Sequence, residues 1–285
     1  MRDMRQTSVT YRLLRRIRVF FSVVILILSI SMMSACSRSP GSATIVAGST
    51  SVQPYAEVLA EEYMILNPDA EIDIQGGGSS AGITAAQTQS ADIGMSSRSL
   101  KEEEMDLLYV EIARDGLALI VNPKNSIQNL TIDQLRDIYS SKITDWSQLG
   151  GKKSRINLIA REEGSGTRSA FTELVMGETE ITPKAIVQDS NGAVRQLVAD
   201  DPNAIGFISM GLVDDNVKAL YLDGIEATRE NILNGSYSLS RPFLFVTNGE
   251  PTGLAKEFID FTLSSEGQKL LSNEGLILAT EGTEK

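Results

Sequence analysis

Apolar runs alternate with amphipathic runs from residue 44 onward. Thr44–Ala47 and Ala70–Gln75 predict strands, because β-branched residues and alternating apolar positions dominate them. Between them, the apolar residues of Tyr55–Leu66 recur at helical spacing and predict a helix. A helix near Ala81–Gln89 and a strand at Ala91–Met95 follow. This strand–helix–strand–helix–strand order predicts an α/β fold with parallel strands and helices on the faces of the sheet.

The second half of the chain repeats this alternation. Gly116–Asn122 is almost entirely apolar, as expected of a strand that is buried on both faces. We expect further strands at Arg155–Ala160, Ala204–Ser209 and Pro242–Thr247, and helices at Thr131–Tyr139, Thr167–Met176, Asn191–Ala199, Leu254–Leu263 and Gly267–Leu271. Two α/β lobes fit this pattern, and such folds bind ligands at the carboxyl ends of their strands.

The first 35 residues have the pattern of a secretory signal. Six arginines and one aspartate precede an apolar stretch, Val19–Met33, which ends in small residues. This stretch is shorter than the roughly 20 residues of a spanning helix, so we favour a cleaved signal over an uncleaved N-terminal anchor. Residues 36–42 are polar with Pro and Gly, and are expected to form a tether.

Cys36 is the only cysteine, which excludes an intramolecular disulfide. Its position after a small residue at the end of the apolar stretch resembles the lipobox of bacterial lipoproteins. That resemblance implies that the Cys36 thiol carries a lipid and that Cys36 becomes the first residue of the mature chain. We therefore expect a lipid-anchored protein at the extracytoplasmic face of the cell membrane.

The charge of the mature chain limits its partners. Without residues 1–35 the chain carries 20 Lys and Arg against 36 Asp and Glu, a formal charge of −16. This balance argues against nucleic-acid binding, which needs a basic surface. An acidic protein that binds an anion must do so through local donors rather than through its overall field.

Three glycine–hydroxyl turns are the candidate chemistry of the chain. They are Gly48-Ser49-Thr50-Ser51, Gly76–Ser80, and Arg161–Thr167, and each lies between a predicted strand and a predicted helix. A helix N-terminus offers free N–H groups, glycine permits close approach of the backbone, and hydroxyls add donors. Together with Arg161, whose planar guanidinium suits two oxyanion oxygens, these turns predict a site for a small tetrahedral oxyanion.

At these residues the chain resembles the phosphate-binding receptors of ABC transporters, within the type 2 periplasmic-binding-protein superfamily. The matching stretches span the mature chain in order: Gly48–Pro54, Gln75–Gly82, Ala91–Arg98, Arg114–Pro123, Arg161–Arg168 and Ala204–Ser209. The resemblance implies two lobes, each a mostly parallel sheet flanked by helices, joined by two crossing strands that match Gly116–Asn122 and Pro242–Thr247. Lobe I would hold residues 43–116 plus 248–285, and lobe II residues 117–247.

The resemblance also implies the ligand contacts. They fall on Thr50, Ser51, Ser79, Arg161, Ser165, Gly166 and Thr167, with Ser97 standing where the best-known members have an aspartate. A serine at 97 can accept the hydrogen bond of protonated phosphate but carries no charge to repel sulfate, and Arg98 beside it would add a cation. Glu163 is expected to hold the Arg161 guanidinium from behind, as outer carboxylates hold metal ligands.

The residue types give little support to an enzyme. The chain has no histidine, so it has no Ser–His or Cys–His dyad, and it has no P-loop. We expect no cofactor and no metal. The sequence predicts a monomeric receptor that captures inorganic phosphate and delivers it to an ABC permease and its ATPase. Alternatives are a receptor for sulfate or molybdate and, with less support, a phosphatase-like enzyme.

Overall fold

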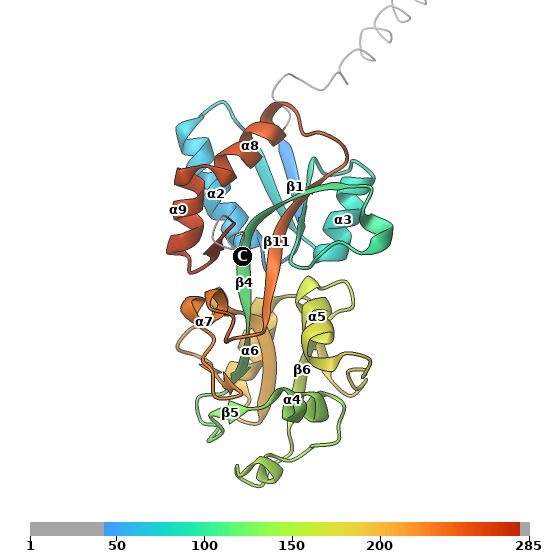
Figure 1. The fold of residues 1–285 in the computed structure, drawn as a ribbon, viewed down its shortest axis with the longest axis vertical. Helices are drawn as coiled ribbons and strands as arrows, with labels where there is room; N and C mark the ends of the chain where they lie inside the picture. The colour runs from blue at the N-terminus through green and yellow to red at the C-terminus, as the bar shows by residue number, and fades with distance from the viewer. Residues whose placement is uncertain (1–42, 280–285) are drawn as a thin grey trace, which may run out of the picture. The chain divides into compact units, whose positions relative to one another are not determined.

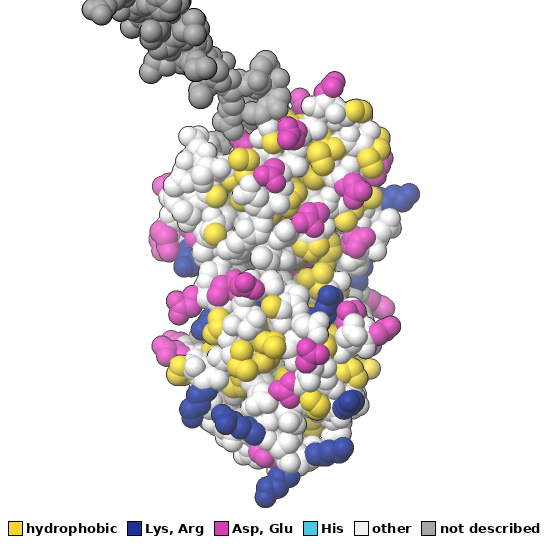
Figure 2. Space-filling view, turned by 180° about the vertical axis from the view of Figure 1, so that it is seen from behind, with side chains coloured by type: hydrophobic (Ala, Val, Ile, Leu, Met, Phe, Trp, Pro, Cys, Tyr) yellow, Lys and Arg dark blue, Asp and Glu magenta, His cyan; other side chains and the backbone are white. Residues whose placement is uncertain are grey.

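The computed structural model describes residues 43–279, which belong to one compact unit (Figure 1; Figure 2 shows the opposite face with its side chains). The predicted signal 1–35, the lipidation site Cys36, the tether and residues 280–285 lie outside the described residues. The strands are β1 (Thr44–Gly48), β2 (Ile72–Gly76), β3 (Ile93–Ser96), β4 (Leu108–Val121), β5 (Asn129–Leu130), β6 (Asn157–Arg161), β7 (Ile186–Gln188), β8 (Ala204–Ser209), β9 (Lys218–Ala219), β10 (Tyr221–Leu222), β11 (Ser240–Thr247) and β12 (Ile277–Leu278). The α-helices are α2 (Gln53–Leu66), α3 (Ser79–Gln87), α4 (Ile132–Tyr139), α5 (Gly166–Phe171), α6 (Asn191–Asp200), α7 (Arg229–Leu233), α8 (Gly253–Leu263) and α9 (Ser265–Asn273).

The first lobe is built on β1, β2 and β3. These strands are parallel, with β1 between the other two, as the strand–helix order predicted. Strands β11 and β4 continue the sheet in antiparallel fashion. Helices α2, α8 and α9 pack on one face, where Leu59, Phe245 and Phe258 share an apolar core, and α3 packs on the other (Figure 1). This arrangement leaves the carboxyl ends of β1, β2 and β3 directed at the second lobe.

The second lobe is built on β8, β6 and β7, which are parallel to one another. Strand β4 pairs with β8 at the edge of this group. Helix α6 covers one face, and α4 and α5 lie on the other, where Tyr139, Phe171 and Phe207 form an aromatic cluster. The rings of Phe171 and Phe207 stack with centroids 4.1 Å apart, which fixes α5 against the sheet.

Strand β4 runs from one lobe into the other. Its residues 108–116 pair with β11, and from Leu117 onward it pairs with β8. The hydrophobic pattern predicted only 116–122 of this strand, because Glu111, Arg114 and Asp115 interrupt the apolar run before Gly116. The two long antiparallel strands, with a mostly parallel sheet on either side, make the two-lobed periplasmic-binding fold. The predicted fold class is therefore confirmed.

Local signals set the helix ends. Helix α4 begins with a reciprocal cap, in which the Gln134 N–H donates to Thr131 Oγ1 at 3.1 Å and the Thr131 N–H donates to Gln134 Oε1 at 2.9 Å. The helix predicted over 167–176 is divided: α5 ends at Phe171 and continues as one π-helical turn, Thr172–Met176. Gly177, with φ of 58°, ends that turn.

Candidate functional site

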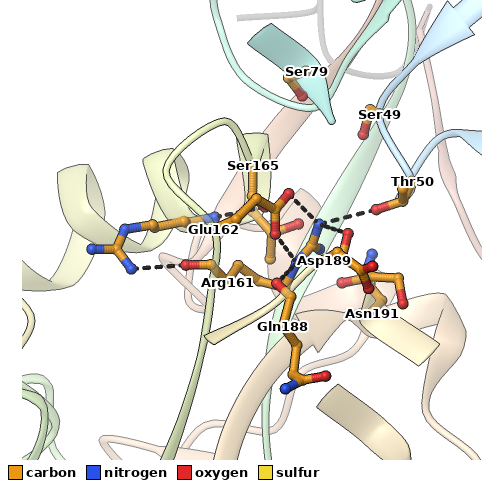
Figure 3. A network of polar contacts seen from close by, with 12 residues as sticks. Ser49, Thr50, Ser79, Arg161, Glu162, Ser165, Gln188, Asp189 and Asn191 are labelled. Carbon is orange, nitrogen blue, oxygen red and sulfur yellow. Dashed lines mark hydrogen bonds and ion pairs between the residues drawn. The ribbon is translucent and has the colours of Figure 1, made fainter. Parts of the chain in front are cut away.

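The predicted contact residues gather where the two lobes meet. The turn before α2 carries Ser49, Thr50 and Ser51, and α3 begins at Ser79. From the second lobe come the turn before α5 and the start of α6 (Figure 3). All eight predicted contacts lie in this region, and all are buried except Thr50, which is partly exposed.

Arg161 is the cation at the centre of the site, at the end of β6. Its Nη2 donates to Thr50 Oγ1 of the first lobe at 3.0 Å and to the Asp189 carbonyl at 2.9 Å (Figure 3). Its Nε donates to the Gln188 carbonyl at 3.2 Å. The third nitrogen, Nη1, is buried and has no hydrogen-bond partner among residues 43–279. Leaving a buried donor of a cation unpaired costs free energy. We therefore expect Nη1 to donate to an acceptor that does not belong to residues 43–279.

The carboxylate that holds Arg161 is Glu162 and not Glu163. Glu162 Oε1 accepts from Nη2 at 2.9 Å and Oε2 accepts from Nε at 3.0 Å. The expectation for Glu163 is corrected by the turn between β6 and α5. The Ser165 N–H donates to the Glu162 carbonyl at 3.1 Å, which places Glu163 at the exposed tip of the turn. Glu162, next to the strand end, remains beside the guanidinium.

Two groups of hydrogen-bonded hydroxyls line the junction of the lobes, and one of them crosses between the lobes. Ser51 Oγ and Thr167 Oγ1 lie 2.8 Å apart, and Asn191 Nδ2 donates to Ser51 Oγ at 2.8 Å. On the first lobe, Ser49 Oγ donates to Ser97 Oγ at 2.9 Å. The Ser97 N–H donates to Ser79 Oγ at 3.0 Å, and the two hydroxyl oxygens are 3.3 Å apart.

Two predicted contacts have visible structural roles. Ser165 caps α5, because its Oγ accepts from the Arg168 N–H at 3.3 Å. At Gly166, a Cβ atom would collide with the hydroxyl oxygens of Ser79 and Ser97 and would lie 3.0 Å from the Ser97 carbonyl carbon. Glycine is therefore required there by the close approach of the two lobes.

The sequence reasoning missed a buried ion pair beside these hydroxyls. Arg241 on β11 faces Asp115 on β4 in the strand register, and its Nη2 and Nε donate to Asp115 Oδ2 at 2.9 and 3.2 Å. Burial raises the pKa of Asp115 and lowers that of Arg241, and the charge of each partner opposes the other's shift. The sequence held one signal for this pair: Asp115 and Arg241 are charged residues directly beside apolar runs that predict buried strands.

Arg98 does not add a cation to the site. Its Nη1 and Nη2 donate to the two oxygens of Glu104 at 2.7 and 2.8 Å, and Nη2 also donates to Ser80 Oγ at 3.4 Å, so its guanidinium is held by residues outside the eight predicted contacts. Arg161 and Arg241, whose guanidinium groups donate to hydroxyls of the predicted contacts, are each paired with a carboxylate. The site thus offers donors rather than net positive charge, as an acidic protein that binds anions requires.

Within residues 43–279, His, Cys, Asp and Glu side chains do not gather in any group of three or more that could hold a metal ion. In the same range, no helix is long and apolar enough to cross a membrane.

Comparison with known proteins identifies the family. The model of the PBP superfamily domain matches residues 36–266. The phosphate-binding protein PstS of Bacillus subtilis is 36% identical over 250 residues, which are 86% of this chain and 83% of the relative. The chain belongs to the PBP superfamily, in the branch that contains PstS. The family is one of binding proteins, so the prediction that the chain is not an enzyme is confirmed.

Solved structures agree with this assignment. One is a crystal structure with bound phosphate of a substrate-binding protein assigned to a phosphate ABC transporter of Clostridium perfringens. It is 46% identical, with a TM-score of 0.80 over 83% of this chain and 99% of that chain. An ABC-type phosphate transport receptor from Vibrio cholerae is 40% identical, with a TM-score of 0.70 over 82% of this chain and 99% of that one.

Proposed function

We propose that this chain captures inorganic phosphate outside the cytoplasm and delivers it to an ABC importer. The observation that carries the proposal is Arg161 Nη1, a buried guanidinium nitrogen without a partner among the described residues. It lies in a region lined by hydroxyls from both lobes. A tetrahedral anion would accept from this nitrogen and from the hydroxyls together. The relatives are named as phosphate-binding or phosphate transport proteins, which supports phosphate as the anion.

The proposed contacts are the eight residues that the family resemblance implies. They are Thr50, Ser51, Ser79, Ser97, Arg161, Ser165, Gly166 and Thr167. Because they come from both lobes, binding requires the lobes to stand close, and release requires a hinge motion about β4 and β11. We place lobe I at residues 43–116 plus 248–285, and lobe II at residues 117–247.

Sulfate is the second candidate ligand, with molybdate behind it. The observation that favours sulfate is that none of the eight proposed contacts has a carboxylate. An aspartate at position 97 would repel an anion that carries no proton, whereas Ser97 has no charge. We expect phosphate to be preferred, by a smaller margin than an aspartate would give.

Calorimetric titration of the chain from residue 37 onward tests the ligand. Phosphate, sulfate and molybdate are added separately, and thermal unfolding is measured with each. A ligand that binds only the folded state stabilises it by RT ln(1 + [L]/Kd), about 4 kcal/mol at a thousandfold excess. We expect phosphate to give the tightest binding and the largest rise in melting temperature. A shift with molybdate or sulfate alone would leave the fold assignment standing and overturn the proposed ligand.

Membrane attachment and delivery need separate experiments. We propose that the lipid attaches through Cys36 and that the mature chain works as a monomer. In full-length protein, Cys36→Ser should release the protein from the membrane fraction or leave it unprocessed. Phosphate uptake by cells that carry the permease but lack this receptor should return only with a membrane-attached, binding-competent chain. Unchanged membrane retention of the Cys36→Ser chain at its mature size would contradict the lipid anchor.

A further inference from the structure

Arg241 is not among the proposed contacts, yet it touches two of them. Its Nη1 donates to Thr167 Oγ1 at 2.7 Å and to Ser97 Oγ at 3.4 Å. The remaining nitrogens are held by Asp115, whose other oxygen accepts from Ser209 Oγ at 2.9 Å. Arg241 and Asp115 are 2% and 0% exposed, so the guanidinium is fixed and always present behind the hydroxyls.

The proton count of the Ser51–Thr167 pair leaves a donor. Each hydroxyl has one proton and two lone pairs. Asn191 Nδ2 donates to Ser51, and Arg241 Nη1 donates to Thr167. The bond between Ser51 and Thr167 uses one of their two protons, so the other proton is left over. The hydroxyl that keeps it has both lone pairs filled and can only donate, whereas the other hydroxyl keeps one free lone pair.

The same count applies to Ser97. The Ser49 oxygen accepts from the N–H groups of Ser51 and Val52, and its own proton is donated to Ser97 Oγ. Arg241 fills the second lone pair of Ser97. The Ser97 proton is then free to go to Ser79 or to a ligand, but Ser97 has no lone pair left for a ligand proton. The sequence-based expectation that Ser97 accepts the proton of phosphate is therefore reversed.

We infer that Arg241, held by Asp115, is a specificity-determining positioning residue of the proposed phosphate site: it fills one lone pair of Thr167 and the second lone pair of Ser97 from behind, so that Ser97 can only donate to the anion. This inference rests on the proposed function. Near neutral pH, phosphate keeps at least one proton, which seeks an acceptor, whereas sulfate has none. Because Ser97 can only donate, position 97 offers no acceptor for this proton, and it therefore favours phosphate over sulfate only weakly.

A charge-neutral double variant tests this role. Asp115→Asn with Arg241→Met removes both charges together, because removing one alone would leave a buried, unpaired ion. Kd values for phosphate and for sulfate are measured by calorimetry in the parent and in the variant. We expect both anions to bind the variant more weakly. The preference for phosphate over sulfate should increase about tenfold, because Ser97 and Thr167 each regain a free lone pair that can accept the phosphate proton.

Arg98→Met with Glu104→Gln is the matched control. It also removes a charge-neutral pair, directly beside Ser97, but the hydroxyl that the Arg98 side chain reaches belongs to Ser80, which is not one of the eight proposed contacts. Its anion preference should equal that of the parent. If the double variant at 115 and 241 weakens both anions by the same factor, Arg241 has only a structural role and the inference is overturned. A parent that binds phosphate and ignores a large excess of sulfate also overturns it.

Arg241→Lys keeps the inference testable if the double variant does not fold. Lysine retains the charge that Asp115 requires, but its single ammonium group lacks the fork that reaches Asp115, Thr167 and Ser97 together. Its anion preference should shift in the same direction by a smaller factor, and an unchanged preference contradicts the inference. Failure of the parent to bind phosphate would instead overturn the proposed function, so the two failures remain distinct.

Discussion

Replacing Gly166 by alanine should weaken phosphate binding on the order of 10²–10⁴-fold while the chain still folds. Gly166 is the first residue of α5 and does not have a positive φ, so alanine suits its backbone. The obstacle lies across the site, because the new methyl group would meet the hydroxyl oxygens of Ser79 and Ser97. The Ser97 carbonyl carbon, 3.0 Å from the new Cβ, belongs to the backbone and has little room to yield.

The expected loss follows from this geometry. Non-bonded carbon atoms rest about 3.5–4.0 Å apart, so the lobes would have to separate by roughly 1 Å at Gly166. Such a separation stretches the 2.8 Å contact between Ser51 and Thr167 and prevents donors of both lobes from reaching one anion. A hydrogen bond to a charged group contributes about 1.5–3 kcal/mol, and losing two weakens binding by about 3–6 kcal/mol, on the order of 10²–10⁴-fold.

Gly164→Ala is the matched control, two residues earlier in the same turn. A Cβ at Gly164 meets only the Ser80 Cβ, at an ordinary distance of 3.8 Å. Calorimetry should give phosphate affinity within about threefold of the parent for this variant, because surface changes of this kind are worth about 0.5 kcal/mol. Thermal unfolding without phosphate should give a melting temperature at or slightly above the parent for Gly164→Ala, because alanine reduces unfolded-state entropy, and a single cooperative transition for Gly166→Ala, which shows that this variant still folds. Near-parental phosphate affinity of Gly166→Ala would refute the close approach of the lobes as the basis of binding.

Three further predictions address other parts of the molecule. Arg161→Lys should weaken phosphate binding about a hundredfold, because lysine keeps the charge but loses the fork; unchanged affinity in calorimetry would place the site elsewhere. Glu162→Gln should weaken phosphate binding more than Glu163→Gln, since only Glu162 holds the guanidinium, and equal effects would contradict this assignment. The hydrogen bond from Arg98 lowers the pKa of Glu104, so the stabilisation from Glu104 is present above the ordinary value of 4.5 and is lost as the pH falls through the lowered value. The melting temperature of Glu104→Gln should thus lie below the parent at neutral pH and approach it in acid, whereas a constant gap would argue against the ionised pair.

The sequence by itself determined the fold class and the parts of the site that local chemistry marks. Alternating apolar runs gave the parallel strands β1, β2 and β3, because strand and helix periodicities are local properties. The glycine–hydroxyl turns indicated Thr50, Ser79 and Thr167, because the glycines and hydroxyls of such a turn lie within a few consecutive residues and can be recognised from the sequence. Resemblance to a known family added the closing lobes and singled out Ser97.

The tertiary structure alone decided which residues stand behind those donors. Arg241 and Asp115 are 126 positions apart and meet only because β11 and β4 run antiparallel between the lobes. The choice of Glu162 over Glu163 depended on the shape of one turn, which composition does not specify. Whether a hydroxyl donates or accepts depends on what fills its lone pairs, and at Ser97 that is set by Ser49 and Arg241. The local sequence thus supplied the hydroxyl groups of the site. Pairing between distant segments decided which of these hydroxyls donate and which accept.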